Sequence, residues 1–278
     1  YGFMNIFYKL CDELHPDSVA FAFDLKAPTF RHKMYDEYKA GRKPMPPELA
    51  EQMPVLKDLL RALGYKIVTK EGYEADDILG TLAFSCKDGD ECYIATGDRD
   101  SLQLVGDNVK VLLASTKMGR PETNIYDVKR IKDDYGVTPH QLIDIKALMG
   151  DSSDNIPGVS GVGQKTAQSL ISELGSIQNI YDNIDTIDIR ETLRNKLKND
   201  KDSAFMSYKL GEICKSVPIE TDYSFYVPDE GDKGEALSIL RSLEMYKLID
   251  KIGLNTVTYD AKPENTTVKE YKRVNSLN

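Results

Sequence analysis

One stretch joins two acidic side chains to a glycine-rich entry into a helix: Asp151-Ser-Ser-Asp154-Asn-Ile-Pro-Gly158-Val-Ser-Gly161-Val-Gly163-Gln-Lys165-Thr166. Paired carboxylates suit a hard divalent cation such as Mg²⁺ or Mn²⁺. A glycine-rich turn before a helix presents unpaired backbone N–H groups, which suit a phosphate. A cation site beside a phosphate site indicates chemistry on a phosphodiester.

Two common nucleotide-binding motifs come close to this stretch without matching it. The spacing from Gly158 to Gly163 fits a P-loop, but Gln164 intervenes and puts Lys165 one position late. The glycine order also differs from a Rossmann fingerprint, and no apolar strand leads into it. An ordinary loop followed by a helix N-cap remains the alternative when the stretch is taken alone.

Composition limits the class of protein. The chain has 278 residues, enough for one large or two modest domains, and 41% of them are hydrophobic. Four cysteines form no C-x-x-C pair, which argues against zinc and against a disulfide scaffold. The cysteine usage fits a reducing cytoplasm, and no apolar run approaches the roughly 18 residues of a membrane span, so we expect no membrane partner. The net charge of −9 argues against a generally basic nucleic-acid binder but permits a local basic surface.

The periodicity of apolar residues predicts an α/β core followed by a helical half. Short strands are expected at 18–23, 65–69, 92–96 and 109–113, with helices at 48–63, at 74–85 and, shorter, near Ser101. Strands that alternate with helices favour a mainly parallel central sheet. We place the core at 1–127, a helical part at 128–255, and a polar tail or interdomain linker at 256–278.

The start of the chain has helical apolar spacing from Tyr1 to Leu10 and lacks methionine. We therefore expect an N-terminal segment to be missing.

Acidic side chains gather where predicted strands end or the adjoining helix begins. Asp24 closes one strand, and Asp98 with Asp100 follows another. Ligand sites in open parallel sheets lie beyond the carboxyl ends of the strands. Further acids come at the start of a predicted helix: Glu74, Asp76 and Asp77. Each group alone could be solvated turn acids or N-caps, but like charges this close repel unless cations compensate them. Together they favour a metal site.

A basic segment follows Asp24 almost at once. It carries Arg31, Lys39, Arg42 and Lys43, which can contact phosphates, while Tyr35 or Tyr38 can stack on a base. A solvent-facing basic loop is the alternative for this segment in isolation. Its place directly after a candidate metal ligand favours a nucleic-acid contact.

The motifs in combination resemble those of the bacterial 5′-nuclease family, which includes the N-terminal 5′→3′ exonuclease domain of DNA polymerase I and stand-alone flap nucleases. They are F-D-L-K-A-P-T-F-R-H from Phe23, Y-K-A-G-R from Tyr38, G-Y-E-A-D-D from Gly72, T-G-D-R-D from Thr96 and G-D-S-S-D-N-I-P-G-V-S-G-V-G-Q-K-T-A from Gly150. The resemblance runs from Tyr1 to about Leu254. It implies a PIN-like core with an arch at about 26–47 and a helix–three-turn–helix DNA-binding element at about 150–175.

The resemblance also implies the site residues. Metal-site acids of the family correspond to Asp24, Glu74, Asp76, Asp77, Asp98, Asp100, Asp151 and Asp154. The arch residues that meet the scissile phosphate correspond to Arg31, Lys39 and Arg42, and we add Tyr38 and Lys43 as DNA contacts of this segment. The phosphate-binding hairpin corresponds to Gly158, Gly161, Gly163, Lys165 and Thr166. The family's first strand, which ends in one more metal-binding aspartate, is expected upstream of Tyr1.

The implied function is metal-dependent 5′→3′ exonuclease and 5′-flap endonuclease activity in DNA replication and repair. The implied cofactors are two Mg²⁺ ions, with Mn²⁺ as a substitute, and K⁺ at the helix–three-turn–helix. The implied partners are DNA with a 5′ flap or 5′ end, RNA–DNA primer junctions, and a covalently following polymerase domain. One rival is a degenerate DNA-binding module that keeps the hairpin without a full metal site. Another is a ribonuclease on a related α/β core.

Overall fold

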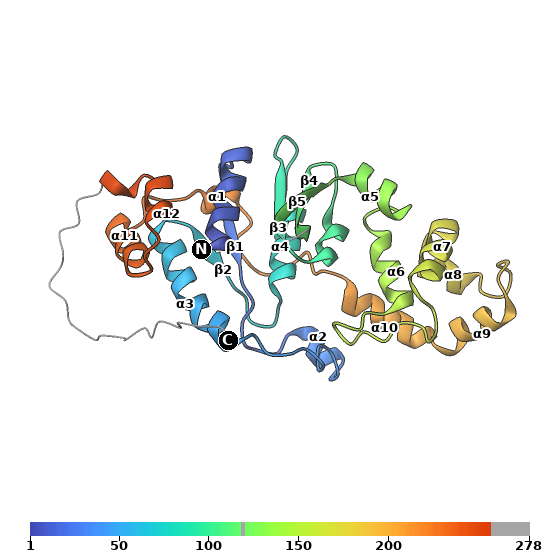
Figure 1. Ribbon diagram of the computed structural model, residues 1–278. Coiled ribbons are helices and arrows are strands. Elements are labelled where there is room, and N and C mark those ends of the chain that lie inside the picture. The colour runs from blue at the N-terminus through green and yellow to red at the C-terminus, as the bar shows by residue number, and fades with distance from the viewer. Residues whose placement is uncertain (118–119, 257–278) are drawn as a thin grey trace. The chain divides into compact units, whose positions relative to one another are not determined.

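Strands and helices alternate along the first half of the chain, and helices follow (Figure 1). The computed structural model describes residues 1–117 and 120–256. These residues form two compact units. Unit 1 comprises Tyr1–Asp17, Glu51–Tyr65 and the residues from Pro228 onward, and unit 2 comprises Ser18–Ala50 and Lys66–Val227.

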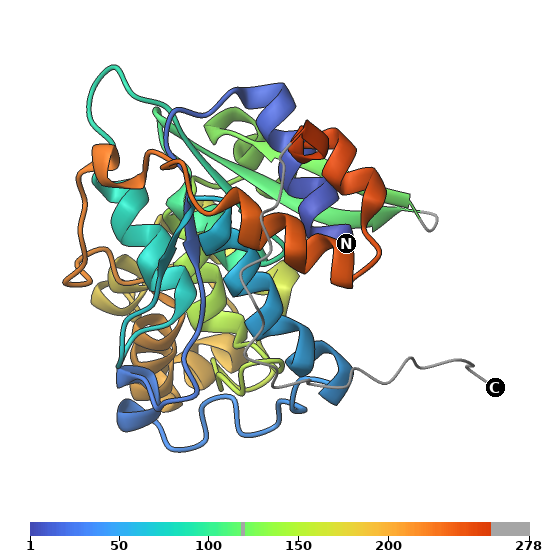
Figure 2. The same ribbon diagram turned by 90° about the vertical axis from the view of Figure 1, so that its left-hand side faces the viewer.

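The strands of unit 2 form two small sheets. Parallel strands β1 (Ala20–Ala22) and β2 (Lys66–Val68) pair with each other. Strand β3 (Cys92–Thr96) runs parallel to β4 (Val109–Lys117), and β5 (Arg120–Tyr126) runs antiparallel to β4. Figure 2 shows β4 and β5 as a long green hairpin. Within the described residues the two sheets share no ladder, but two of the three pairings are parallel, as predicted.

Helix α4 (Ala75–Phe84) connects the two sheets, since it packs against both β1 and β3. Ile78 and Leu82 lie in a cluster with residues of β1 and β2, whereas Ala83 packs with Ile94 of β3. The short helix η1 (Arg99–Leu104) follows β3 and also contacts α4. Its position carries the acids after β3 toward the start of α4.

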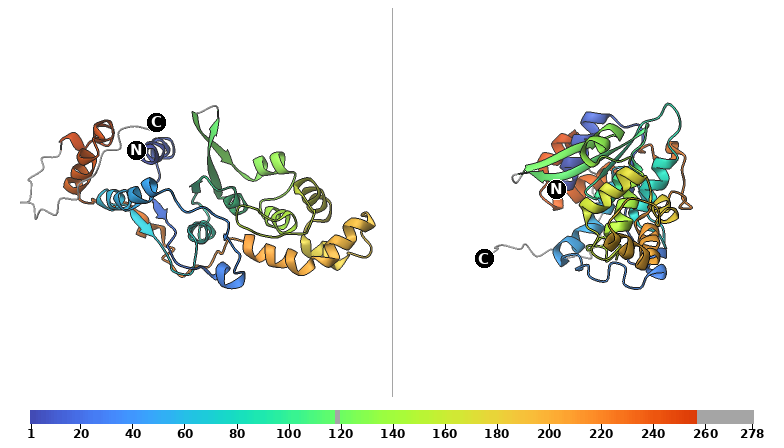
Figure 3. Two further views of the ribbon diagram at one scale, coloured as in Figure 1. Left: turned by 60° about the horizontal axis from the view of Figure 1, so that its bottom comes forward. Right: turned by 90° about the vertical axis from the view of Figure 1, so that its right-hand side faces the viewer.

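The remainder of unit 2 is helical, as expected for residues after about 128. Its helices are α5 (Val128–Tyr135), α6 (Gln141–Met149), α7 (Gln164–Leu174), α8 (Ile177–Asp182), α9 (Glu191–Asn199), α10 (Lys201–Gly211) and η2 (Tyr223–Tyr226). Helices α6 to α10 surround one apolar cluster, which includes Leu148, Val162, Ile171, Ile180 and Leu197. Helices α8 and α10 contact α6, and the left view of Figure 3 shows α8 to α10 in yellow to orange. A further short helix, α2 (Phe30–Met34), begins the basic segment.

Unit 1 consists of α1 (Gly2–Leu14), most of α3 (Pro47–Ala62), α11 (Lys233–Ser242), α12 (Tyr246–Lys251) and the short η3 (Leu254–Thr256). The chain returns to α3 at Gly64, where the Asp229 N–H donates to the Gly64 carbonyl at 3.1 Å. Gly64 has φ +86, and a Cβ there would lie 2.1 Å from the Asp229 carbonyl oxygen. Only glycine fits this close approach.

Two further expectations concern the ends of the chain and membranes. Helix α1 agrees with the apolar spacing that predicted a helix at the start of the chain. The predicted tail from 256 lies outside the described residues apart from Thr256. Among the helices in the described ranges, none is long and apolar enough to cross a membrane.

Candidate functional site

Six carboxylates from separate parts of unit 2 line one cavity of about 100 Å³. They belong to Asp24, Glu74, Asp76, Asp98, Asp100 and Asp154. Asp24 follows β1, Asp98 and Asp100 follow β3, and Glu74 and Asp76 lie at the start of α4. The carboxyl ends of the strands thus bring together residues that lie many tens of positions apart in the sequence.

Asp154 reaches this cavity because the chain turns back sharply after α6. Asp151 and Ile156 form an antiparallel bridge in which each N–H donates to the other's carbonyl at 2.8 Å. Gly150 and Gly158 flank the bridge with φ +71 and +64. A Cβ on Gly158 would lie 2.3 Å from the Gly150 nitrogen, so the two backbones require glycine to come this close.

Asp76 shows how much negative charge the cavity holds. Burial, followed by the charges of Asp98, Asp100 and Asp24, raises the pKa of Asp76 to about 7. The backbone N–H of Ala75 donates to Asp24 at 2.8 Å and fixes that carboxylate nearby. This raised pKa of Asp76 indicates that the cations of the cavity do not balance its negative charge.

Asp100, Asp151 and Asp154 form a second close group, with one oxygen of each within 4.8 Å of the others. Lys146 of α6 donates to both Asp100 and Asp151, the latter at 2.7 Å. Burial opposes ionisation of Asp151, but hydrogen bonds from Lys146 and Ser153 outweigh it and lower the pKa of Asp151 to about 2.

Lys146 is a site residue that the sequence analysis missed. It is buried in α6 between Ile145 and Ala147. A buried lysine is almost always paired, so the signal was a lysine within a largely apolar stretch of helix.

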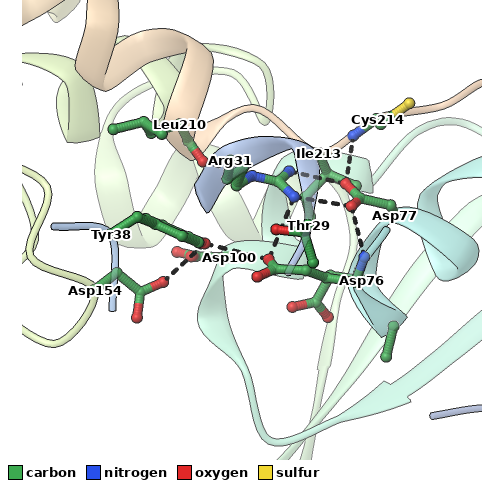
Figure 4. A network of polar contacts seen from close by, with 12 residues as sticks. Thr29, Arg31, Tyr38, Asp76, Asp77, Asp100, Asp154, Leu210, Ile213 and Cys214 are labelled. Carbon is green, nitrogen blue, oxygen red and sulfur yellow. Dashed lines mark hydrogen bonds and ion pairs between the residues drawn. The ribbon is translucent and has the colours of Figure 1, made fainter. Parts of the chain in front are cut away.

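Arg31 and Asp77 form a buried ion pair. Arg31 is 3% exposed and uses all five N–H groups, as Figure 4 shows in part. Two bonds of 2.8 Å reach the Asp77 carboxylate, and others reach Glu74 and the carbonyl oxygens of Leu210 and Glu212. Asp77 is 0% exposed and also accepts from the N–H groups of Glu74 and Cys214. Neither side chain has a free polar group to offer a metal or a phosphate in this structure.

Lys39 and Arg42 are paired differently. Lys39 Nζ lies 2.7 Å from Glu74 Oε1, and the Lys39 side chain keeps partial exposure. Arg42 Nη2 lies 2.5 Å from Asp154 Oδ1, and about half of its side chain is exposed. Both cations line the same cavity as the acids. They neutralise two carboxylates while remaining close to solvent.

The glycine-rich turn lies between α6 and α7 and does not line the acidic cavity. Gly161 has φ +68, whereas Gly163 has ordinary backbone angles as the N-cap of α7. Side chains of α10 and the residue before it support the turn: Ser203 donates to the Gly158 carbonyl at 2.7 Å, Ser207 accepts from its N–H at 2.9 Å, and Asp200 accepts from Ser160 N–H at 2.7 Å. The surface of the turn is exposed at Gly161, Gly163, Gln164, Lys165 and Thr166.

The structure thus divides the predicted site residues into three sets. The cavity collects Asp24, Glu74, Asp76, Asp98, Asp100, Asp154, Arg31, Tyr38, Lys39 and Arg42, with Asp151 attached through Lys146. Asp77 does not line the cavity and forms an ion pair with Arg31. The hairpin residues Gly158, Gly161, Gly163, Lys165 and Thr166 form a separate surface, and Lys43 is exposed beyond Arg42.

Two protein-family models match the chain. Residues 1–136 match "5'-3' exonuclease, N-terminal resolvase-like domain", and residues 137–233 match "5'-3' exonuclease, C-terminal SAM fold". The second match begins in the loop before α6 and covers the glycine-rich hairpin.

Curated relatives are much longer than this chain. DNA polymerase I of Caldicellulosiruptor bescii is 42% identical over 258 residues, which are 92% of this chain and 30% of that protein. DNA polymerase I of Bacillus subtilis is 40% identical over 279 residues, which are 99% of this chain and 31% of that protein. The chain therefore spans about 30% of the length of these relatives.

Solved structures share the fold. The phage T5 5′-exonuclease with bound zinc has a TM-score of 0.64 at 22% identity, covering 90% of this chain and 89% of the other. The catalytic core of Rad2 in complex with DNA has a TM-score of 0.57 at 20% identity, covering 91% of this chain and 83% of the other. The predicted fold class, a PIN-like core followed by a helical half, is confirmed.

Proposed function

The chain belongs to the 5′-3′ exonuclease family, and on that premise we propose that it hydrolyses DNA phosphodiesters at 5′ ends and 5′ flaps. The observation that carries the proposal is the convergence of six carboxylates on one cavity that also contains Lys39 and Arg42. Such a cavity combines ligands for hard cations with side chains that attract phosphate. The degenerate binding module has no need of these acids.

The donor set fits divalent cations. Among the described residues, the cations that line the cavity beside the six carboxylates are those of Arg31, Lys39 and Arg42, and Lys146 pairs with Asp100. Mg²⁺ prefers carboxylate oxygen and usually retains several waters, so some acids would act through bound water. Bound divalent cations would supply activation of water and stabilisation of the leaving 3′ oxygen. We propose two Mg²⁺ ions, with Mn²⁺ as a substitute.

Different acids have different roles in this proposal. One ion would use the group of Asp100, Asp151 and Asp154, whose oxygens lie close together. The other would use acids around Asp76, namely Asp24, Asp98 and Glu74, whose charges raise its pKa. Asp77 would act only through Arg31, because its oxygens are already occupied by four N–H donors.

Lys39 and Arg42 would change partners during the reaction. Each now neutralises a carboxylate that a divalent cation would also use. A bound cation removes that need, and the freed side chains could stabilise charge on the phosphoryl oxygens. Arg31 differs because its five N–H groups are all taken and its side chain is buried. We therefore propose that Arg31 acts as structural support.

Binding of duplex DNA is proposed for the hairpin rather than the cavity. Backbone N–H groups at the first turn of α7 and the exposed Lys165 suit phosphate oxygens. Thr166 adds a hydroxyl, and Lys43 supplies a further cation near the cavity. K⁺ at the turn belongs to the same proposal.

The cellular setting is proposed from the relatives' names. Relatives named DNA polymerase I suit removal of flaps or RNA primers in replication and repair, with a polymerase domain following in the same protein. We propose that the protein acts on DNA in the cytoplasm, which fits a role in replication and repair. The nuclease domain is proposed to span 1–255, with its core at 1–127, its arch at 26–47 and its helical part at 128–255.

A flap substrate tests the proposal. A 5′-labelled flap oligonucleotide incubated with the protein and Mg²⁺ should be cut near the junction of single strand and duplex, and EDTA should stop cleavage. Asp98→Asn provides the control for a contaminating nuclease. Tight binding of the flap without cleavage, in Mg²⁺ and in Mn²⁺, would instead support the degenerate binding module.

A further inference from the structure

The ring of Tyr38 is not presented to solvent. Tyr38 is 4% exposed and packs in a small cluster with Ile156 and Leu210. Ile156 belongs to the turn that carries Asp154, and Leu210 belongs to α10. A ring in this place is unsuited to stacking on a base, which was the role expected from the sequence.

The hydroxyl of Tyr38 lies between two acids of the cavity. It is 3.2 Å from Glu74 Oε2 and 3.5 Å from Asp154 Oδ2, and Figure 4 shows it directed toward Asp154. The other oxygen of each carboxylate belongs to a cation, Lys39 for Glu74 and Arg42 for Asp154. Glu74 Oε2 also accepts from Arg31 at 3.3 Å. The single proton of the phenol can go to only one carboxylate at a time, so the hydroxyl donates to Glu74 or to Asp154 and is a contact that the two acids share.

The backbone around Tyr38 is fixed to the same turn. The Lys39 N–H donates to the Asp154 carbonyl at 2.9 Å, and the Asn155 side chain donates to the Glu37 carbonyl at 2.8 Å. Lys39 has φ +58, a conformation that a residue with a side chain adopts only when its surroundings hold it. These contacts place the phenol where it reaches both acids.

We propose that Tyr38 is a positioning residue whose hydroxyl fixes the spacing of Glu74 and Asp154 for a divalent cation. This inference rests on the proposed function, because it assigns those two acids to the metal site. Hydrogen bonds to metal ligands orient them, and their loss typically weakens metal binding by about 10–100-fold. A phenol is protonated at neutral pH, so the hydroxyl of Tyr38 can act as a donor.

Tyr38→Phe separates this role from stacking, because it keeps the ring and removes only the hydroxyl. Mn²⁺ affinity measured by calorimetry without DNA should fall by about tenfold or more. The Mg²⁺ concentration for half-maximal cleavage should rise in the same ratio, while kcat at saturating Mg²⁺ should change little. The Kd for a flap in EDTA should stay within about twofold, because the ring and the hairpin are intact.

Tyr226→Phe is the matched control. Tyr226 is 3% exposed, and its hydroxyl donates to the Glu220 carbonyl at 2.6 Å, away from the cavity. The Tyr226→Phe variant also loses the hydrogen bond of a buried tyrosine hydroxyl, so its Mn²⁺ binding isotherm should match that of the wild-type protein. An unchanged Mn²⁺ isotherm for Tyr38→Phe in a protein that cleaves flaps would overturn the inference alone. Weakened Mn²⁺ binding in a protein that never cleaves flaps would leave the inference and overturn the proposed function.

Discussion

The acidic cavity and the glycine-rich hairpin handle charge in opposite ways. The cavity holds six carboxylates and fills much of its own hydrogen-bonding capacity with Arg31, Lys39 and Arg42. The hairpin satisfies the inner side of its backbone with Ser203, Ser207 and Asp200 and leaves its outer side exposed. We propose that the cavity takes up cations from outside and that the hairpin binds an anion.

The difference separates chemistry from binding. Substitutions among the acids should affect metal affinity and turnover, and substitutions on the hairpin should affect DNA affinity. Within the cavity a second contrast applies, between the buried Arg31–Asp77 pair and the accessible pairs of Lys39 and Arg42. We propose that the first pair supports the fold and that the other two exchange partners during the reaction.

The largest expected effect is on stability and comes from Arg31→Met. It leaves the fully buried Asp77 carboxylate unpaired, which should lower the free energy of unfolding by about 3–5 kcal/mol. Arg130→Met is the control, because its pair with Asp134 lies at the surface and should contribute little to stability. Urea unfolding in EDTA measures both. Equal losses for the two variants would contradict a supporting role for the buried pair.

The free energy of unfolding should depend on pH because of Asp76, whose carboxyl lies among the other acids of the cavity. Its carboxyl ionises near pH 4 in an unfolded chain, whereas burial and neighbouring acids raise its pKa to about 7 in the fold. Between these values the folded state keeps a proton that the unfolded state has released. The free energy of unfolding should therefore fall as pH rises from about 4 to about 7, by at most roughly 4 kcal/mol from this group.

Asp76→Asn removes this contribution. In EDTA at pH 8 the variant should be more stable than wild type, and the two should converge near pH 4, as urea unfolding at several pH values would show. Added Mg²⁺ should stabilise wild type more than the variant. If the free energies of unfolding of the two proteins ran parallel at all pH values, the pKa of Asp76 would not be raised in the fold.

A smaller effect should follow from Lys39→Met. Lys39 competes with a divalent cation for Glu74, so its removal should tighten Mn²⁺ binding several-fold. Cleavage should fall in the same variant, because the freed lysine is proposed to meet the phosphate. Lys43→Met, which alters a neighbouring exposed lysine, should leave the Mn²⁺ isotherm unchanged. Weaker Mn²⁺ binding by Lys39→Met would contradict exchange between lysine and metal.

Much of the site could be predicted because it follows strand ends. The helices at 48–63 and 74–85 were expected within two residues of α3 and α4. The acids after β1 and β3 followed from the rule for parallel sheets. These features depend on local periodicity and on turns, which the sequence displays directly.

What could not be predicted depends on distant contacts. Strand β5 has the sequence Arg-Pro-Glu-Thr-Asn-Ile-Tyr, which is largely polar and lacks an apolar alternation, and it is a strand because it pairs with β4. The basic residues around Tyr38 in the sequence predicted an exposed ring, but Ile156 and Leu210 bury it. The buried position of Lys146 likewise appears only when α6 packs beside η1.

The most direct test measures turnover and DNA affinity side by side for Asp98→Asn and Lys165→Ala. We expect Asp98→Asn to lose at least about 10²-fold in kcat and to keep its flap Kd in EDTA within a few-fold. Lys165→Ala should keep its kcat at saturating DNA, weaken binding, and reduce the slope of log K against log salt by about one unit. Lys198→Ala, an exposed lysine already paired with Asp185, should leave both quantities near wild type. Loss of DNA binding in Asp98→Asn together with loss of turnover alone in Lys165→Ala would contradict the separation of the cavity from the hairpin.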